Sequence, residues 1–304
     1  ATLSSAQINA IDGLELAEMD TDKIAALNTS ALSKVSGSQI ASLSDAQVAA
    51  LTTSQIKSLS ASQVTALTGT QVADLTAAQI SVMSATQVSA IDSGDIAELT
   101  SSAVAALTTA QVKAMSTAQI SKFDSDQISN LGTAQISVMS AAQANAIDAS
   151  VVENLTDYQI KAINTTAFAG MDTAHIAALT SDQFSVITTA QAKALTAAQL
   201  TKMNADQIGS LGTAQVAMLN GTQIAAIDTA DLVLMATEQV AALNLGAIAG
   251  LTTTQVSKLT EDQVGALKTN QVRTLSTNQI VALKTNQVQA MSTDQIAALS
   301  SGQA

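Results

Sequence analysis

The sequence predicts an all-α protein, a solenoid or superhelix of very short helices with one helix in each eight-residue repeat. Two observations support this. A single octad register runs from Leu3 to Leu299 without insertion or deletion, and each octad carries the start signals of a helix. We label the octad positions a to h, with a at Leu3 and at every eighth residue after it, so that the 304 residues hold 38 octads. A short fixed period indicates stacked equivalent units rather than one globular core.

The start of each predicted helix is marked at positions b and e. Ser, Thr, Asp or Asn occupies b in nearly every octad, and Gln usually follows at e, as in Thr108 and Gln111 of the typical octad Leu107–Ala114. This is the spacing of a capping box, in which the b side chain accepts from a first-turn N–H and the Gln side chain returns to the N–H of b. Large apolar residues at a and f fit a hydrophobic staple around the same boundary. We therefore expect each helix to run from about c to h.

The charges agree with this boundary. Most acidic residues lie at b to e, and most basic residues lie at g or h, for example Lys113 and Arg273. A helix dipole favours acids at its start and bases at its end by roughly 0.3–1 kcal/mol per site. The charge pattern is a third signal for one short helix per octad.

Two other backbone conformations could carry a period of eight residues. A continuous helix is excluded because eight residues at about 100° each leave a drift of roughly 80° per octad, which would spread position a around the whole cylinder. A β-solenoid remains the alternative, since Thr, Val and Ile suit strands. Against it, Pro is absent, the 13 Gly hold no fixed position for turns, and a and f would face opposite sides of a strand.

A single octad is too short to be stable, because isolated helices need about 12–15 residues to be even marginal. Stability must come from coil packed on coil. We expect the a and f side chains, with the small residues at h, to line the interior, while c, d and g face water. The number of octads per superhelical turn is not visible in the sequence.

The register gives no linker or composition shift at which to divide the chain. We predict one continuous array over residues 1–304, as a segment of a longer chain or of a polymer, since joining Ala304 to Ala1 preserves the register. A second level of repetition is present. The segment from Leu131 to Ile147 resembles the one from Leu211 to Ile227, 80 residues later. Ten whole octads separate them, which indicates growth by in-frame duplication.

Composition excludes several classes of function. The net charge of −12 opposes nucleic acid as a partner, because phosphate binding needs a basic face. No apolar run approaches the roughly 20 residues of a membrane span. The absence of Cys leaves no disulfide or thiol chemistry and is compatible with a location outside the cell.

Few residues are candidates for a site. His175 is the only histidine and occupies e, where a ring nitrogen can take over part of the capping role of Gln. Two Asp-x-Asp pairs have the spacing of some calcium loops, at Asp20/Asp22 and at Asp124/Asp126. Capping and the helix dipole already account for both pairs, and the acidic residue that completes such a loop is missing. Calcium therefore stays a minor alternative.

We predict no catalytic, cofactor-binding or metal site and no cofactor. The sequence holds no Gly-rich phosphate loop and no nucleophile paired with a base. The three Phe residues, at 123, 168 and 184, fall on a or f and are expected in the core, and Tyr158 at d stands alone. Stacking platforms for sugars or bases are therefore not expected.

By elimination the sequence favours a structural role. Its octads, as at Leu107–Ala114 and from Leu251 to Gln255, resemble the repeat tracts of long bacterial cell-surface and adhesin-like proteins. That resemblance implies an extracellular or cell-surface filament, stalk or coat, with self-association end to end or side by side, and it transfers no functional residue. Two alternatives stay open: a superhelical scaffold that binds a protein partner, and a calcium-dependent adhesin repeat region.

Overall fold

The computed structural model describes residues 5–303 and is helical throughout, with no strand among those residues. The all-α prediction is confirmed and the β-solenoid alternative is not supported. The chain divides into two compact units, Ala1–Leu155 and Thr156–Ala304, which are described separately. The single continuous array over residues 1–304 stays a prediction.

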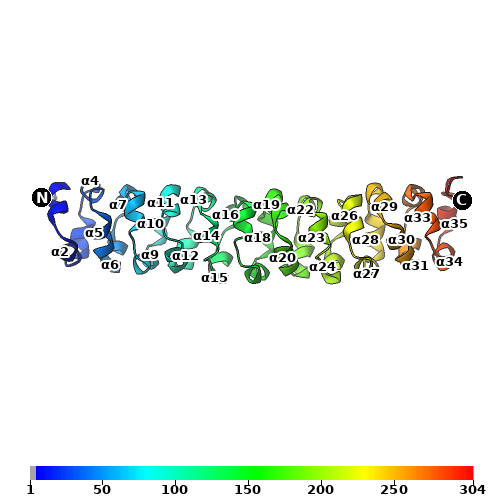
Figure 1. Cartoon of the computed structure of the whole chain (residues 1–304), viewed down its shortest axis with the longest axis horizontal. Helices are drawn as coiled ribbons and strands as arrows, with labels where there is room; N and C mark the ends of the chain where they lie inside the picture. The colour runs from blue at the N-terminus through cyan, green and yellow to red at the C-terminus, as the bar shows by residue number, and fades with distance from the viewer. Residues whose placement is uncertain (1–4, 304) are drawn as a thin grey trace. The chain divides into compact units, whose positions relative to one another are not determined.

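The first unit contains short α-helices and two 3-10 helices that follow one another in chain order (Figure 1). Its elements are α1 (Ser5–Ala10), α2 (Gly13–Ala17), α3 (Thr21–Ala25), α4 (Thr29–Leu32), α5 (Gly37–Ser42), α6 (Asp45–Ala50), α7 (Thr53–Ser58), α8 (Ala61–Thr65), α9 (Gly69–Ala73), α10 (Ala77–Val82), α11 (Ala85–Ser89), η1 (Asp95–Glu98), α12 (Ser101–Ala105), α13 (Thr109–Ala114), α14 (Thr117–Ile120), α15 (Ser125–Ser129), α16 (Thr133–Ser137), α17 (Ala141–Ala144) and η2 (Ala149–Asn154).

The second unit repeats the same arrangement with α-helices alone. Its elements are α18 (Asp157–Ala162), α19 (Thr165–Gly170), α20 (Thr173–Ala178), α21 (Ser181–Val186), α22 (Thr189–Ala194), α23 (Ala197–Leu200), α24 (Ala205–Ser210), α25 (Thr213–Val216), α26 (Gly221–Ala226), α27 (Thr229–Leu232), α28 (Thr237–Ala242), α29 (Leu245–Gly250), α30 (Thr253–Lys258), α31 (Glu261–Gly265), α32 (Thr269–Thr274), α33 (Thr277–Val281), α34 (Thr285–Gln289) and α35 (Thr293–Ala297).

Each α-helix begins at position c, and from α2 onward the residue before it is an extended cap at b, as the sequence predicts. In α13 the cap Thr108 has φ −78° and ψ 159°, and its side chain accepts from the backbone N–H of Gln111. The helix ends at h, and the next residue, Met115, is again extended at φ −63° and ψ 142°. Two extended residues, a and b, therefore link α13 to the next helix and turn the chain. Other helices end earlier, at f or g, and their C-cap keeps a helical backbone, as Ser121 does after α14.

Within each unit, a helix packs against the third helix after it in the chain, as α3 does on α6 and α21 on α24. Hydrogen bonds between successive coils join residues 28 and 31 positions apart, such as Gln47 with Met19 and with Leu16. One turn of the superhelix therefore takes between three and four octads.

The core consists of positions a and f, which is where the sequence places it. In α13 and its flanks, Leu107 and Met115 are each 4% exposed and Val112 is fully buried. The expectation that h also lines the interior is wrong, since Ala66 is half-buried and Ala114 is exposed. Position h lies instead at the outer contact between coils. A Cβ placed on Gly37, at c, would come 3.0 Å from the Cβ of Ala66 in the next coil. The small size of h thus serves close approach of coils rather than filling of the core.

Candidate functional site

The third buried position is e, and its Gln side chain is the most repeated polar feature of the molecule. Gln111 is 1% exposed. Its Oε1 accepts from the N–H of Thr108 at 2.5 Å, which completes the capping box of its own helix. Its Nε2 donates to the carbonyl oxygens of Ile80 and Met83, each at 2.7 Å, in the preceding coil. One side chain thus joins the start of its own helix to the end of an earlier one.

We call this arrangement the glutamine clamp. The acceptors are the carbonyls of an f residue and of the following a residue at a helix end. The f carbonyl also accepts the backbone N–H of that a residue, as Ile80 O does from Met83 at 3.2 Å. The clamp recurs in both units, for example from Gln55 to Leu27 at 2.8 Å and from Gln255 to Ile227 at 2.9 Å. It leaves no polar atom of these buried amides unpaired, which matters because an unsatisfied buried polar group costs about 1–3 kcal/mol.

Sequence reasoning predicted only the capping half of this arrangement. The signal for the other half is the choice of amide over carboxylate at e. A capping box accepts Glu as well as Gln, but only the amide has N–H donors for the preceding coil. Gln occupies e in 28 of the 38 octads and Glu in only one, at Glu15. This preference indicates a second partner that must be an acceptor.

Some octads lack a hydroxyl or carboxylate at b and keep only the glutamine. At Ala236, Lys268 and Lys284 the backbone N–H still donates to the Oε1 of the following Gln, at 2.7 Å in each case. Gly132 and Gly212 do the same with Gln135 and Gln215. The side chain at b is therefore dispensable for this contact.

An Asn at b can replace the glutamine. Asn244 precedes Ala247 at e, and its Oδ1 accepts from the N–H of Ala247 at 2.9 Å. Its Nδ2 donates to Leu219 O at 2.6 Å and to Ala217 O at 2.9 Å, in the preceding coil. The pair Asn and Ala thus performs both tasks of the clamp. Asn28 and Asn164 also precede an Ala at e and accept its N–H in the same way.

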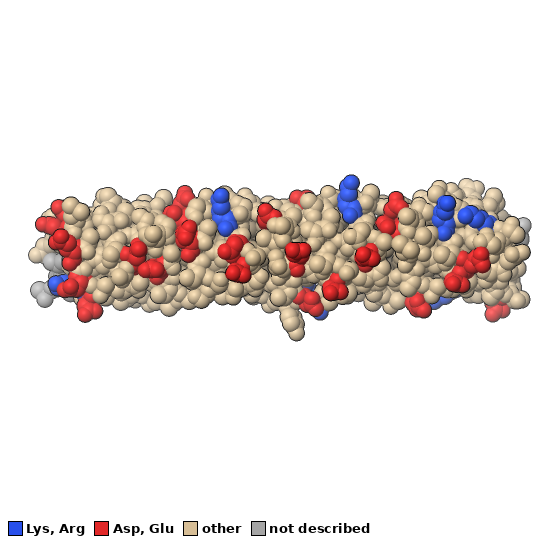
Figure 2. All heavy atoms as spheres, turned by 90° about the horizontal axis from the view of Figure 1, so that it is seen from below, with Lys and Arg blue, Asp and Glu red and all other residues tan. Residues whose placement is uncertain are grey.

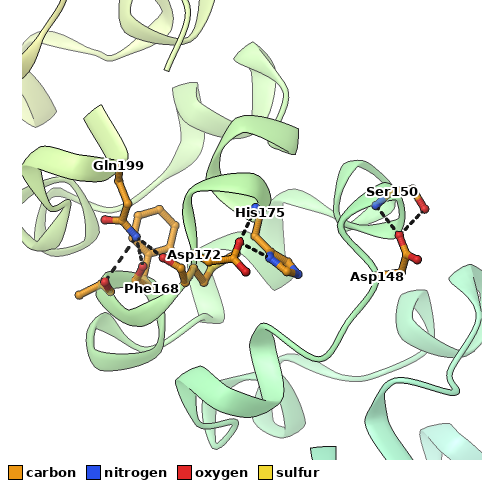
Figure 3. A network of polar contacts seen from close by, with 8 residues as sticks. Asp148, Ser150, Phe168, Asp172, His175 and Gln199 are labelled. Carbon is orange, nitrogen blue, oxygen red and sulfur yellow. Dashed lines mark hydrogen bonds and ion pairs between the residues drawn. The ribbon is translucent and has the colours of Figure 1, made fainter. Parts of the chain in front are cut away.

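His175 at e is buried, with 5% exposure. Its Nδ1 lies 2.6 Å from Oδ1 of Asp172, which also accepts the backbone N–H of His175 at 3.0 Å (Figure 3). These two hydrogen bonds, the side-chain one first, lower the pKa of the Asp172 carboxyl. The ring therefore pairs with the cap side chain of its own helix. Beside it, Gln199 forms an ordinary clamp to Phe168 O at 3.0 Å and to Met171 O at 2.8 Å.

The two Asp-x-Asp pairs are occupied as capping and surface groups. Asp124 accepts from the N–H of Gln127 at 2.8 Å as the cap of α15. Asp20 forms an ion pair with Lys23 at 2.8 Å, and this hydrogen bond and charge lower the pKa of Asp20. Among residues 5–303 no three His, Cys, Asp or Glu side chains gather where they could hold a metal ion. Calcium binding stays untested.

The aromatic residues divide as predicted between core and surface. Phe168 and Phe184 are fully buried and Phe123 is 4% exposed, whereas Tyr158 is 75% exposed at the start of α18. The described part of the chain contains no helix long and apolar enough to cross a membrane.

The surface offers shallow grooves between coils. The grooves have volumes of ≈ 290 to 370 Å³ and are lined by helix starts and caps, for example Thr260, Glu261 and Asn286. Figure 2 shows acidic side chains spread over the face seen rather than gathered into one patch. No arrangement of these residues suggests a reaction, and the absence of catalysis stays a prediction.

Comparison with known families assigns the repeat. The ALTTAQ repeat matches four stretches, residues 16–53, 88–125, 224–261 and 264–301, which together make up half of the chain. The chain belongs to the ALTTAQ repeat family. Every matched stretch begins at position f and ends at c. No curated protein matches the chain.

The length of an ALTTAQ repeat match has a structural meaning here. Each match starts at the residue whose carbonyl accepts from the clamp glutamine 31 positions later: Leu16 from Gln47, Val88 from Gln119, Ile224 from Gln255 and Val264 from Gln295. One match therefore contains one complete clamp, with both the donor and its acceptors in the preceding coil.

Proposed function

We propose that the chain is a structural repeat protein that forms an extracellular filament, stalk or surface coat and performs no catalysis. The observation that carries this proposal is the glutamine clamp, which repeats one contact from coil to coil. Most octads take part in the same contacts with their neighbours, so coils can be added without any change of design. The number of coils can then change without altering these contacts, and length is what a stalk or filament provides.

Self-association end to end is supported by what a coil offers to the one that follows it. Residues at a and f in the middle of either unit are almost fully buried by the next coil. In the last described coil, Val288 is 42% and Ile296 is 43% exposed. A second copy that supplied apolar side chains and glutamine donors would cover both the apolar residues and the clamp acceptors.

The test is the assembly state of the full chain, by light scattering over a range of concentrations and by negative-stain electron microscopy. We expect filaments or longer assemblies whose population grows with concentration. Replacing Val288 and Ile296 with Lys should abolish assembly, whereas Ala297→Lys, on the exposed side of the same helix, should not. A wild-type chain that stays monomeric at every concentration, or variants that all assemble equally, would contradict the proposal and favour the scaffold alternative.

The extracellular location needs its own measurement. Brief treatment of intact source cells with a protease that cannot enter them should remove the protein if it lies on the surface. Protection until the cells are lysed would exclude that location.

A further inference from the structure

The glutamine clamp is missing from two consecutive octads of the first unit. From Gln39 to Gln143 the residue at e donates to the preceding coil in every octad except two, where e is Asp95 and Ala103. The carbonyls 28 and 31 positions before these two residues receive no side-chain donor from the described part of the chain. They belong to Val64, Leu67, Val72 and Leu75.

No neighbouring side chain repairs the gap. The Asn that replaces the clamp at Asn244 has no counterpart here, since the b residues are Asp92 and Thr100. Asp92 accepts from the N–H of Gly94 at 2.7 Å, and Thr100 accepts from the N–H of Ala103 at 3.2 Å. Both serve their own octads, and a carboxylate at b has no donor to offer.

The first of these octads also places a carboxylate, that of Asp95, at position e, where an amide normally lies. A Cβ added to Gly69 in the preceding coil would come 3.0 Å from Oδ1 of Asp95, so this carboxylate lies directly against that coil. Burial raises the pKa of Asp95, and the charges of Asp92 and Glu98 raise it further. Repulsion between like charges and the missing hydrogen-bond donor therefore both weaken the contact between this octad and the preceding coil.

The two octads span 16 residues, which is more than half of a turn that joins residues 28 and 31 positions apart. On either side of the gap the clamps resume, at Gln87 and at Gln111. Apolar packing across the gap is intact, with Ile96 and Val104 fully buried. One hydrogen bond lies at its edge, from Oγ1 of Thr65 to Ala90 O at 3.0 Å.

We propose that the interface between residues 64–75 and 95–103, which we call the seam, is a hinge at which the first unit opens on one side. Apolar contacts hold the seam and resist separation less specifically than directional hydrogen bonds. The clamps at Gln87 and Gln111 hold the rest of the same turn. Opening the seam would bend the solenoid locally without breaking the chain of clamps before and after it.

Native-state hydrogen exchange of the full chain, read by mass spectrometry, tests this. Peptides covering residues 64–75 and 95–103 should exchange faster than peptides from the clamped interface of residues 80–91 and 111–119. Installing the missing donor with Ala103→Gln should slow exchange at the seam by roughly ten- to a hundredfold, the effect of two net hydrogen bonds. The same addition at an exposed d position, Ala46→Gln, should leave the seam unchanged.

A second pair of variants separates the missing donor from charge repulsion. Asp95→Gln supplies an amide with the reach of the other clamps, whereas Asp95→Asn only removes the charge. We expect a larger slowing for Asp95→Gln. Equal slowing by both variants, seam peptides as protected as the reference peptides, or no effect of Ala103→Gln would overturn the proposal.

Discussion

Replacing one clamp amide with a carboxylate tests whether the clamp holds successive coils together. In Gln111→Glu the new side chain keeps the shape and can still accept from Thr108, but its carboxylate cannot donate to Ile80 O and Met83 O. Two hydrogen bonds of about 0.5–1.5 kcal/mol each are lost. A charge is also placed in a site that is 1% exposed, facing two carbonyl oxygens. We expect a local destabilisation of about 3–5 kcal/mol at pH 7.

The pH dependence of this variant follows from the same geometry. Burial beside carbonyl oxygens should raise the pKa of the introduced carboxyl, because the charged form is disfavoured and the neutral acid can donate one hydrogen bond. Stability is therefore retained below the ordinary pKa of Glu and lost as the pH rises through the raised value. Loss of stability on acidification instead would contradict this reading.

The assay must be local, because repeat arrays do not always unfold in one step. Hydrogen exchange of peptides around residues 80–83 and 108–115, together with urea unfolding followed by circular dichroism, measures both the local and the global effect. Gln289→Glu is the matched control, since Gln289 lies at g on the exposed side of α34. If both substitutions had the same effect, the clamp would not be the contact that joins the coils.

Three further predictions concern the core, the coil contacts and the charges. Val112→Asp should destabilise the fold by several kcal/mol in urea unfolding because it buries an unpaired charge, whereas Thr109→Asp on the exposed start of the same helix should be nearly silent; equal effects would refute our assignment of inside and outside. Gly250→Ala should lower the melting temperature and reduce the free energy of unfolding by about 1–3 kcal/mol or more, because the added Cβ would lie 2.1 Å from a backbone carbon of the facing coil. Gly209→Ala is the control: its Cβ would have no atom within 4 Å, so this substitution should be neutral or stabilising. Burial and the neighbouring carboxylate of Asp228 raise the pKa of Asp231. The neutral carboxyl group therefore stabilises the fold below the ordinary pKa of Asp, and this stabilisation is lost as the pH rises through the raised pKa. Asp231→Asn should therefore lose less stability between pH 3 and pH 7 than the wild type, and identical losses would show that this carboxyl is not strained.

The local structure could be predicted from the sequence because its causes lie within one octad. Thr108 and Gln111 are three residues apart and fix where a helix starts, and Val112 follows in the buried position that the apolar pattern assigns. The roles of Phe168 and Phe184 in the core follow from the same register. These features need no knowledge of what lies in the next coil.

The contacts between coils could not be predicted, because every octad resembles every other. The pattern does not say which octad lies above which, so neither the partner of a Gln Nε2 nor the length of a turn is visible. The assignment of h failed for this reason: Ala66 is small because it faces Gly37 in another coil, a relation that no local rule contains. The Asn244 and Ala247 pair is likewise intelligible only once Leu219 is seen to lie beside it.

The separation of 28 residues between a clamp glutamine and the carbonyl of its a-position acceptor is three and a half octads. Successive coils are therefore offset by half an octad. Because of this offset, each helix start packs against the extended link between two helices of the preceding coil. The extended links of neighbouring coils therefore do not lie side by side, and each link is covered by a helix of the next coil. Gain or loss of whole octads preserves this offset, whereas gain or loss of four residues would place one extended link against another. A solenoid with this offset can lengthen only in units of eight residues, which agrees with the spacing of 80 residues between its duplicated segments.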